Sequence, residues 1–356
     1  MTLSVLLLSR YARRGPSSRV RFYIYEDALA RAGISLTFAP FFEDDYLIAL
    51  YGKASTWRAA LSAYWRRLLQ LASTRRYDLL WIEKELMPWL PAWFERTVIG
   101  SVPYAVDFDD AWFLRYRQHR FPPLRALLRD KLERIVRDAA LTVVGNQYLA
   151  EWARDSGARA ILPLPTVVDV AHYSVRPRPD GPFTIGWIGT PSNAANLTQI
   201  VEPLRRLCRD GSSRLLVIGA EGFTMEGIPI ERAPWDEDTE AELLSRCDVG
   251  IMPLPDDPWS RGKCGYKLIQ YMAVGRPVIA SPVGANTAIV RHGETGFLAA
   301  TPEHWFSALA ALRDDSALRL SFGLAGRQLV ETQYSVQATS GALVQSLYRA
   351  ALGRNA

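Results

Sequence analysis

The chain has 356 residues, of which 49% are hydrophobic and 22% charged, and its formal net charge is +5. This length favours two domains, and the composition is that of a globular protein and excludes an intrinsically disordered chain. No apolar run reaches the roughly 18–20 residues that a membrane-spanning helix needs, so no transmembrane segment is expected.

Apolar strands alternate with longer helical stretches along the first half of the chain. This alternation is typical of a parallel α/β sheet, and we expect helices at 20–32 and 57–72 among the connections. The expected strands are 3–8, 35–38, 79–82, 104–107 and 141–144. A signal peptide is not expected, because the charges of the N-terminal segment follow its apolar stretch, which we interpret as the first strand.

The segment 57–76 places tryptophan, tyrosine and leucine at helical spacing, with arginines on the remainder of the helix. A basic amphipathic helix with aromatic residues is typical of a membrane-surface element. The alternative is an ordinary helix that covers a sheet with its apolar stripe and holds its arginines in solvent. The pattern leaves both interpretations open.

A second series of strands follows a proline-rich stretch, 173–182, which cannot continue a helix and is interpreted as the linker. The expected strands of this half are 183–188, 214–218, 249–252, 277–280 and 296–298. Three cysteines and four histidines are scattered over the chain, so neither a disulfide framework nor a metal site is expected. The sequence therefore predicts two Rossmann-like halves in a reducing compartment.

The stretch 248–298 predicts a strand, a loop that contains Gly265, and then a helix. The free N–H groups and the positive dipole end at the start of such a helix suit a pyrophosphate, and Lys263 and Lys267 add positive charge there. Gln270 lies one helical turn beyond Lys267, and its amide can hydrogen-bond ribose hydroxyls.

Three carboxylates follow a strand of the first half, at the strand end where open α/β sheets place ligands: Asp107, Asp109 and Asp110. Packed carboxylates shift one another's pKa and can move protons, so Asp109 is a candidate for orienting or deprotonating an acceptor hydroxyl. Trp112 is a candidate for stacking an acceptor sugar. The alternative is structural, with Asp110 capping the next helix and Asp107 satisfying backbone donors.

Two other strand ends are assigned to structure rather than to function. The run Glu83-Lys84-Glu85 is interpreted as surface charge, and Asn146 as a helix cap.

The stretch YMAVGRPVIASPVGANTAIVRHGETGFL, 271–298, resembles the donor-binding segment of family 4 retaining glycosyltransferases, most closely over 272–281 and 293–298. The resemblance implies an α/β fold of the GT-B type: two Rossmann-like domains with parallel sheets that face each other across a cleft. It assigns 1–172 to the acceptor side and 173–335 to the nucleotide-sugar donor, with the C-terminal helix 336–356 packing back on the first domain.

The resemblance also implies site residues. The family's glycine loop after the first strand falls on Gly15, where a plain strand-to-helix turn is the alternative, and a histidine of the family aligns with Asp109. Catalytic roles fall on Asp109 and Lys267, and acceptor contacts on Asp107, Asp110 and Trp112. The implied donor-binding residues are Gly15, Arg19, Gly189, Thr190, Lys263, Gly265, Tyr266, Lys267 and Gln270.

The sequence departs from the family pattern at three positions. Members carry two glutamates with seven residues between them. The second falls on Gln270 and the first on Gly262, which offers no carboxylate to the donor sugar. The family's diphosphate-binding arginine falls on Thr190. We interpret these changes as a variant in which Lys263 and Lys267 neutralise the phosphates.

The resemblance predicts a hexosyltransferase-type enzyme that moves a sugar from a nucleotide-diphosphate sugar to an acceptor hydroxyl with retention of configuration. Cell-surface glycan or glycolipid synthesis is the expected setting, with a glycan or lipid-linked acceptor, no cofactor, no essential metal and no nucleic acid partner. The expected location is the cytoplasm, peripheral on the inner face of the cell membrane, where basic charge suits anionic lipid. A non-catalytic nucleotide-sugar binding protein and a GT-B-type epimerase are the alternatives.

Overall fold

The structure is a computed structural model that describes residues 2–52 and 54–353. The chain divides into two compact units. Unit 1 comprises Met1–Thr166 and Thr339–Ala356, and unit 2 comprises Val167–Ala338. Residues 354–356 of the expected C-terminal helix lie outside the described residues.

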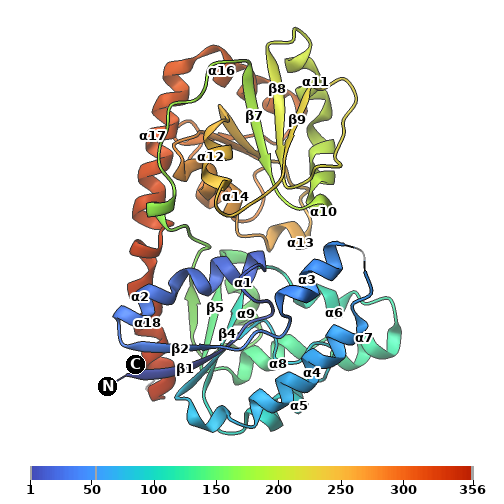
Figure 1. The fold of residues 1–356 in the computed structure, drawn as a ribbon, viewed down its shortest axis with the longest axis vertical. Coiled ribbons are helices and arrows are strands. Elements are labelled where there is room, and N and C mark those ends of the chain that lie inside the picture. Colours follow the sequence, from blue (N-terminus) through green and yellow to red (C-terminus); the bar gives the residue numbers. More distant parts are fainter. Residues whose placement is uncertain (1, 53, 354–356) are drawn as a thin grey trace. The chain divides into compact units, whose positions relative to one another are not determined.

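Unit 1 is built on a six-stranded sheet in the order β2-β1-β3-β4-β5-β6, in which every neighbouring pair is parallel. Helices connect successive strands, and Figure 1 shows them packed around the sheet. The strands are β1 (Leu3–Leu8), β2 (Ile34–Phe38), β3 (Leu79–Glu83), β4 (Tyr104–Phe108), β5 (Leu141–Val144) and β6 (Ile161–Pro163). The connecting helices are α1 (Pro16–Arg21), η1 (Tyr23–Tyr25), α2 (Glu26–Arg31), α3 (Asp44–Tyr51), α4 (Trp57–Leu71), η2 (Thr74–Arg76), α5 (Ala92–Ile99), α6 (Phe113–Arg117), α7 (Pro122–Leu128), α8 (Lys131–Asp138) and α9 (Gln147–Asp155).

The C-terminal helix α18 (Val336–Leu352) contributes its residues from Thr339 onward to unit 1. The hydroxyl of Tyr25 shares a 2.8 Å hydrogen bond with that of Thr339, and the Tyr348 hydroxyl donates to the carbonyl of Ala32 at 3.1 Å. These bonds attach α18 to the segment from η1 to the end of α2.

Unit 2 repeats the design with a second six-stranded parallel sheet, in the order β12-β11-β10-β7-β8-β9. Its strands are β7 (Phe183–Ile188), β8 (Ser213–Ile218), β9 (Ile230–Ala233), β10 (Val249–Met252), β11 (Val278–Ala280) and β12 (Gly296–Leu298). Its helices are η3 (Val170–His172), α10 (Pro191–Ala194), η4 (Ala195–Ile200), α11 (Val201–Cys208), α12 (Glu240–Ser245), α13 (Pro258–Arg261), α14 (Tyr266–Ala273), α15 (Asn286–Ile289), α16 (Pro302–Asp314) and α17 (Ser316–Gln333).

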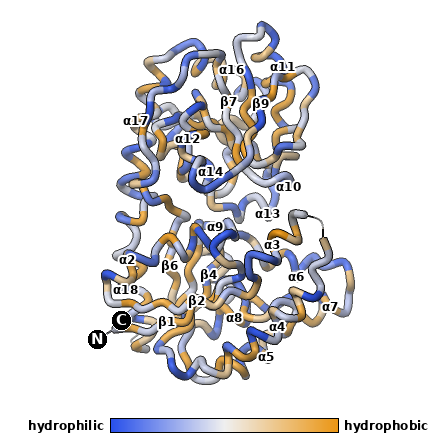
Figure 2. The backbone as a smooth tube through the Cα atoms, viewed as in Figure 1, coloured by the Kyte–Doolittle hydropathy of each residue, from blue (hydrophilic) through white to orange (hydrophobic). Residues whose placement is uncertain are grey.

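The sheet of unit 2 is buried on both faces, because successive strand side chains point to opposite sides. Leu216 and Ile218 of β8 pack with α14 and α17, whereas Leu215 and Val217 pack with α11 and α16. The strands therefore read as continuous apolar runs, which Figure 2 shows as orange stretches in the interior of each unit.

Three details differ from the sequence-based expectations. The expected helix 20–32 is broken into α1, η1 and α2. The short edge strands β6 and β9 were not predicted. Unit 1 ends its first segment at Thr166, whereas the predicted boundary follows residue 172. The observed boundary is earlier because Val168 exchanges backbone hydrogen bonds with Tyr334 and Val336 of unit 2.

No helix in the described parts of the chain is both long enough and apolar enough to cross a membrane.

Candidate functional site

The glycine loop of unit 2 lies at the carboxyl edge of the sheet, between β10 and α14. Gly265 is the N-cap of α14 and adopts a left-handed conformation, with φ 67° and ψ 17°. A Cβ atom at this position would also lie 2.3 Å from Cδ1 of Ile289. Both the backbone conformation and the close contact require glycine, which lets the chain turn directly into α14.

Lys267, in the first turn of α14, packs against the end of β7. Its Nζ lies 4.1 Å from the centroid of the Trp187 ring, and a Cβ atom on Gly189 would lie 2.6 Å from the same Nζ. The absence of a side chain at Gly189 therefore leaves the space that the Lys267 ammonium occupies.

Lys263 reaches the loop that follows β7. Its Nζ donates to Oδ1 of Asn193 at 3.4 Å, and Nδ2 of Asn193 donates to Oγ1 of Thr190 at 2.9 Å. The structure thus brings Gly189, Thr190, Lys263 and Lys267 together at one edge of the unit 2 sheet, although two loops far apart in the sequence supply them.

The two lysines influence each other electrostatically. Burial, and after it the positive charge of Lys263, lower the pKa of Lys267 to about 7. The Lys267 ammonium, whose charge burial disfavours, lies at a helix N-terminus and is suited to an anionic ligand that would restore its charge.

Two further predicted donor-binding residues, Tyr266 and Gln270, lie on α14 itself. Gln270 is buried, and Tyr266 is half-buried against the core around α14. Tyr266 also contacts the hydroxyl of Tyr173, which donates to Glu240 at 2.5 Å. Tyr266 therefore forms part of a buried polar network. Gly262, the position onto which the resemblance places a glutamate, ends helix α13.

In unit 1, Asp107 is buried in an ion pair, and its contact with an acceptor stays a prediction. Arg21 donates to both of its carboxylate oxygens, at 2.9 and 3.0 Å, and both side chains are 1% exposed. The third hydrogen bond of Arg21 goes to the carbonyl of Leu164. Asp107 forms half of a buried, bidentate ion pair that ties α1 to β4.

Asp109 and Asp110 share one partner, Lys84, whose Nζ lies 2.9 Å from an oxygen of each. Burial acts to raise the pKa of Asp109, but Lys84 and a hydrogen bond from Ser17 outweigh it, and the pKa is lowered. Asp109 is therefore a carboxylate at neutral pH. Asp110 does not cap the next helix as the structural alternative proposed, because the N-cap of α6 is Trp112.

Trp112 is surrounded by cations. Its Nε1 donates to Glu85 at 2.9 Å, and the charged groups of Arg10, Lys84 and Arg115 lie 4.5, 4.9 and 4.6 Å from the ring. The ring attracts these cations through its negative face, and the three cations in turn would attract an anionic ligand to this edge of unit 1.

The Gly15 loop lies beside these groups. A Cβ atom on Gly15 would lie 2.3 Å from Cβ of Tyr11, so this N-cap of α1 requires glycine. The hydroxyl of Ser18 donates to Glu83 at 2.6 Å, and Ser17 bonds to Asp109. Arg19 is buried in the same helix.

The run Glu83-Lys84-Glu85 is buried, at 3–5% exposure, and the surface-charge prediction for it is wrong. Glu85 pairs with the buried Lys131 at 2.7 Å, and Lys84 adopts φ 64° to reach the two aspartates. The signal was present in the sequence: the run directly follows a strand beside the one that ends in the aspartates, and carboxyl ends of parallel strands share one edge. Asn146 caps α9 as predicted, accepting from Leu149 N at 2.9 Å.

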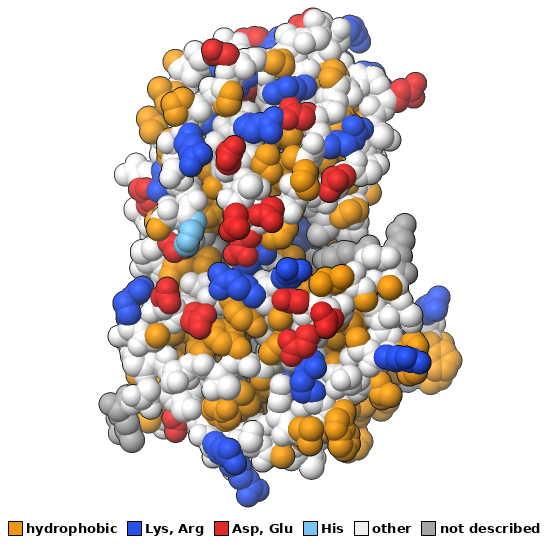
Figure 3. All heavy atoms as spheres, viewed as in Figure 1, with side chains coloured by type: hydrophobic (Ala, Val, Ile, Leu, Met, Phe, Trp, Pro, Cys, Tyr) orange, Lys and Arg blue, Asp and Glu red, His pale blue; other side chains and the backbone are white. Residues whose placement is uncertain are grey.

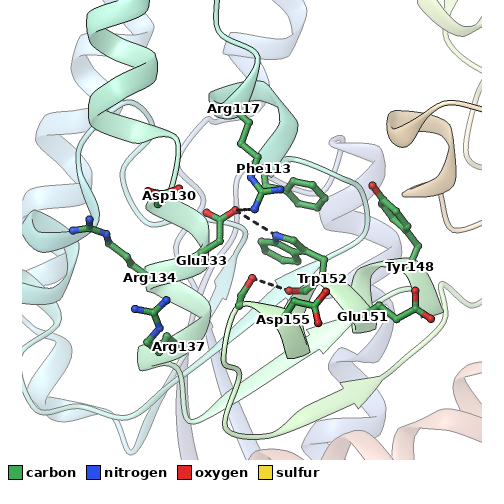
Figure 4. Close-up of a pocket in the computed structure, with 11 residues that line it drawn as sticks. Phe113, Arg117, Asp130, Glu133, Arg134, Arg137, Tyr148, Glu151, Trp152 and Asp155 are labelled. Atoms are coloured by element: carbon green, nitrogen blue, oxygen red, sulfur yellow. Dashed lines mark hydrogen bonds and ion pairs between the residues drawn. The ribbon is translucent and has the colours of Figure 1, made fainter.

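Unit 1 also contains a cavity of about 560 Å³ away from the predicted residues (Figure 4). The Glu133 carboxylate points toward the Arg117 guanidinium and the Trp152 indole, at 2.6 and 3.4 Å. Both acidic and basic side chains line the cavity. The lining residues are Phe113, Arg117, Asp130, Glu133, Arg134, Arg137, Tyr148, Glu151, Trp152, Asp155 and Ser156. They include none of the predicted site residues.

Among the residues that the structure describes, no group of three or more His, Cys, Asp or Glu side chains is arranged to hold a metal ion.

Comparison with known proteins relates unit 2 to a family of sugar-transferring enzymes. The family model described as "Glycosyl transferases group 1" matches residues 182–315. A D-inositol 3-phosphate glycosyltransferase from Pseudarthrobacter chlorophenolicus is 30% identical over 145 residues, which cover 40% of this chain and 32% of that relative.

Solved structures resemble the whole chain. Sucrose-phosphate synthase from Thermosynechococcus elongatus has a TM-score of 0.71 at 16% identity, with 99% of each chain covered. Anabaena HepE (Alr3699) in complex with UDP-glucose has a TM-score of 0.72 at 14% identity, with 97% of this chain and 99% of that chain covered. A glycosyltransferase from Rickettsia africae has a TM-score of 0.68 at 13% identity, with 100% of both covered. The fold is therefore of the GT-B type, with two Rossmann-like domains.

Proposed function

We propose that this protein is a glycosyltransferase of the hexosyltransferase type that uses a nucleotide-diphosphate sugar. The observation that carries the proposal is the group formed by Lys263, Lys267 and the start of α14 beside Gly189. It lies within residues 182–315, which the glycosyl transferases group 1 model matches. Unit 2 would bind the donor, and the edge of unit 1 around Asp109 and Trp112 the acceptor.

The proposed chemistry follows from the charge that develops during the reaction. Breaking the bond between sugar and diphosphate leaves negative charge on the departing oxygen, and preorganised donors stabilise that charge where it forms. Protonated Lys267, Lys263 and the N–H groups at the start of α14 would provide this stabilisation. Ionised Asp109 would accept a hydrogen bond from the acceptor hydroxyl and orient it, without forming a covalent bond.

We propose further that transfer retains the configuration of the sugar and that the acceptor is a glycan or a lipid-linked glycan. The proposed role is cell-surface glycan synthesis at the inner face of the membrane. They rest on the resemblance to family 4 and on the basic surface. We also propose that the reaction needs neither a cofactor nor an essential metal.

Gly262 favours a second candidate, a binding protein that holds a nucleotide sugar without transferring it, because no carboxylate meets the donor sugar at this position. Purified protein, incubated with labelled nucleotide sugars and a bacterial lipid extract, distinguishes the two. Transfer of label to lipid or glycan supports the transferase. If the protein binds the nucleotide sugar but transfers no label and releases no nucleotide, it is a binding protein. Interconversion of the nucleotide sugar without an acceptor would indicate an epimerase.

The affinity for a nucleotide sugar is expected to fall as pH rises through about 7, because Lys267 loses its proton there in the free protein. In the pH range where Lys267 is protonated only in the complex, the affinity decreases by about tenfold per pH unit. Titration calorimetry between pH 6 and 8.5 measures this, and a nucleotide sugar is the proper ligand because its doubly esterified diphosphate does not titrate in this range. Lys263→Ala should shift the decrease to higher pH, since it removes a like charge. A pH-independent affinity would contradict the role of Lys267.

Asp109→Asn is expected to lower the rate of transfer about a hundredfold or more, within the range of acid–base and orienting groups, while leaving the affinity for the donor unchanged. The matched control is Asp110→Asn, which keeps the ion pair between Lys84 and Asp109. Initial rates and donor binding for both variants provide the measurement. Equal losses of transfer rate in the two variants would show that Asp109 has no role beyond that of Asp110.

A further inference from the structure

The helix α4 turns an apolar face to solvent. Leu61, Trp65 and Leu69 are 65%, 66% and 59% exposed, and Trp57 is 62% exposed. These residues recur at four-residue spacing and so lie along one side of the helix. Figure 3 shows exposed hydrophobic side chains at the lower right of unit 1, where Figure 1 places α4 and α7. Of the two interpretations that the sequence left open, the one in which this stripe covers the sheet is therefore wrong.

The buried side of α4 explains this orientation. Ala63, Arg67 and Leu71 face the sheet. The guanidinium of Arg67 donates to the carbonyls of Ala39 and Ser9 at 2.9 Å, satisfying backbone groups that follow β2 and β1. Turning the apolar stripe inward would remove these bonds and leave buried acceptors unpaired, which is costly.

Exposed arginines lie near both ends of this face, at Arg58 and at Arg75 and Arg76. Residues 46–77 contain five arginines and one lysine but no aspartate or glutamate. Arg58, Arg75 and Arg76 are exposed, and Arg66 is partly exposed, with an oxygen of Glu43 at 3.6 Å from its Nε. Helix α3, which contacts α4, adds exposed Ile48 and Leu50.

From this combination we infer that the α4 face, defined by Trp57, Leu61, Trp65 and Leu69 with Arg58, Arg75 and Arg76, docks on an anionic lipid bilayer. Tryptophan and leucine insert at the boundary between headgroups and acyl chains, and arginines bind lipid phosphates. A second copy of this chain is a poorer partner, because an isologous contact would place the same cations against each other.

Helix α4 lies next to the carboxyl edge of the unit 1 sheet. The carbonyls that Arg67 binds follow the carboxyl ends of β1 and β2, and the Tyr64 hydroxyl donates to the carbonyl of Pro88, beyond β3. Asp109 and Lys84 lie at this same edge of the unit 1 sheet. If the proposed function holds, a docked α4 would bring lipid-linked acceptors close to the acceptor edge, but docking itself does not depend on that function.

Vesicle flotation of the full chain tests the inference. We expect binding to vesicles of phosphatidylcholine mixed with phosphatidylglycerol, weak binding to phosphatidylcholine alone, and loss of binding at high salt. Combined Leu61→Ser, Trp65→Ser and Leu69→Ser should lower the partition coefficient at least about tenfold. Combined Arg58→Gln, Arg75→Gln and Arg76→Gln should lower it about a hundredfold on the anionic vesicles, since each arginine near the surface contributes about fivefold.

Exposed residues of unit 2 provide matched controls. Leu320→Ser with Leu324→Ser replaces leucines that are 65% and 57% exposed, and Arg209→Gln, Arg232→Gln and Arg291→Gln removes the same charge. These variants should bind like the wild type. The inference is overturned if wild-type protein does not bind anionic vesicles, if the α4 variants bind as well as the controls, or if the serine variant instead abolishes a concentration-dependent dimer. Nucleotide binding, measured on the same preparations, reports separately on the proposed function.

Discussion

Lys267→Ala is expected to lower kcat/KM for sugar transfer about 100- to 1000-fold, the usual cost of removing one preorganised group that stabilises developing negative charge. The Lys267 ammonium is held against the Trp187 ring in space left by Gly189, so its position does not depend on the ligand. The loss should appear in both KM and kcat, because Lys267 binds the diphosphate of the donor and the interaction strengthens as the diphosphate departs. Steady-state kinetics measure it.

Two control variants make this result specific. Lys263→Ala, whose lysine is anchored through Asn193, should cause a smaller loss, and Arg209→Ala on the surface of unit 2 should cause none. Removal of the partly buried Lys267 charge should not destabilise the fold, so the melting temperature should stay the same or rise. Full turnover in a folded Lys267→Ala protein would refute the assignment of the donor group.

Asp107→Ala is expected to destabilise unit 1 by about 3–5 kcal/mol, because it leaves the Arg21 guanidinium buried without its bidentate partner. Denaturant unfolding of the variant and the wild type measures the difference. The double variant Arg21→Met with Asp107→Leu should recover most of the loss, since apolar residues of similar size often replace a buried ion pair at little cost.

Asp110→Ala is the matched control for Asp107. Its side chain is 21% exposed, and Lys84 keeps Asp109 as a partner, so a loss of about 1 kcal/mol or less is expected. If Asp107→Ala kept full stability but lost transfer activity, Asp107 would be an acceptor-binding residue after all.

The strand alternation and the glycine loop were predictable because both depend on local pattern. Buried parallel strands such as β1 and β7 are continuous apolar runs, and the structure begins and ends them at the predicted residues. The helix α14 follows Gly265 as predicted, since few residues other than glycine adopt its left-handed conformation. The missed strands β6 and β9 are short and lie at sheet edges, where one side is unpaired and the apolar signal is weak.

Local pattern did not predict which residues pair with the buried charges, or whether the apolar side of a helix faces the sheet or solvent. The spacing of Trp57, Leu61 and Trp65 shows that they share one side of a helix, but it does not show whether that side faces the sheet or solvent. The apolar side faces solvent because the opposite side carries Arg67, which hydrogen-bonds carbonyls more than twenty residues away in the sequence. Similarly, the sequence places Asp107 and Asp109 at one strand end, but only the structure shows that Arg21 pairs with the first and Lys84 with the second.

The central claim is that the Lys267 group of unit 2 binds the diphosphate of a nucleotide-sugar donor. The most direct test is the shift in melting temperature of the wild type and of Lys267→Ala with UDP, GDP, dTDP and ADP, because a ligand that binds only the folded state stabilises it. The claim predicts a shift with one nucleotide above the others, and loss of that shift in Lys267→Ala. No shift with any of them at millimolar concentration, or an equal shift in the variant, would contradict it.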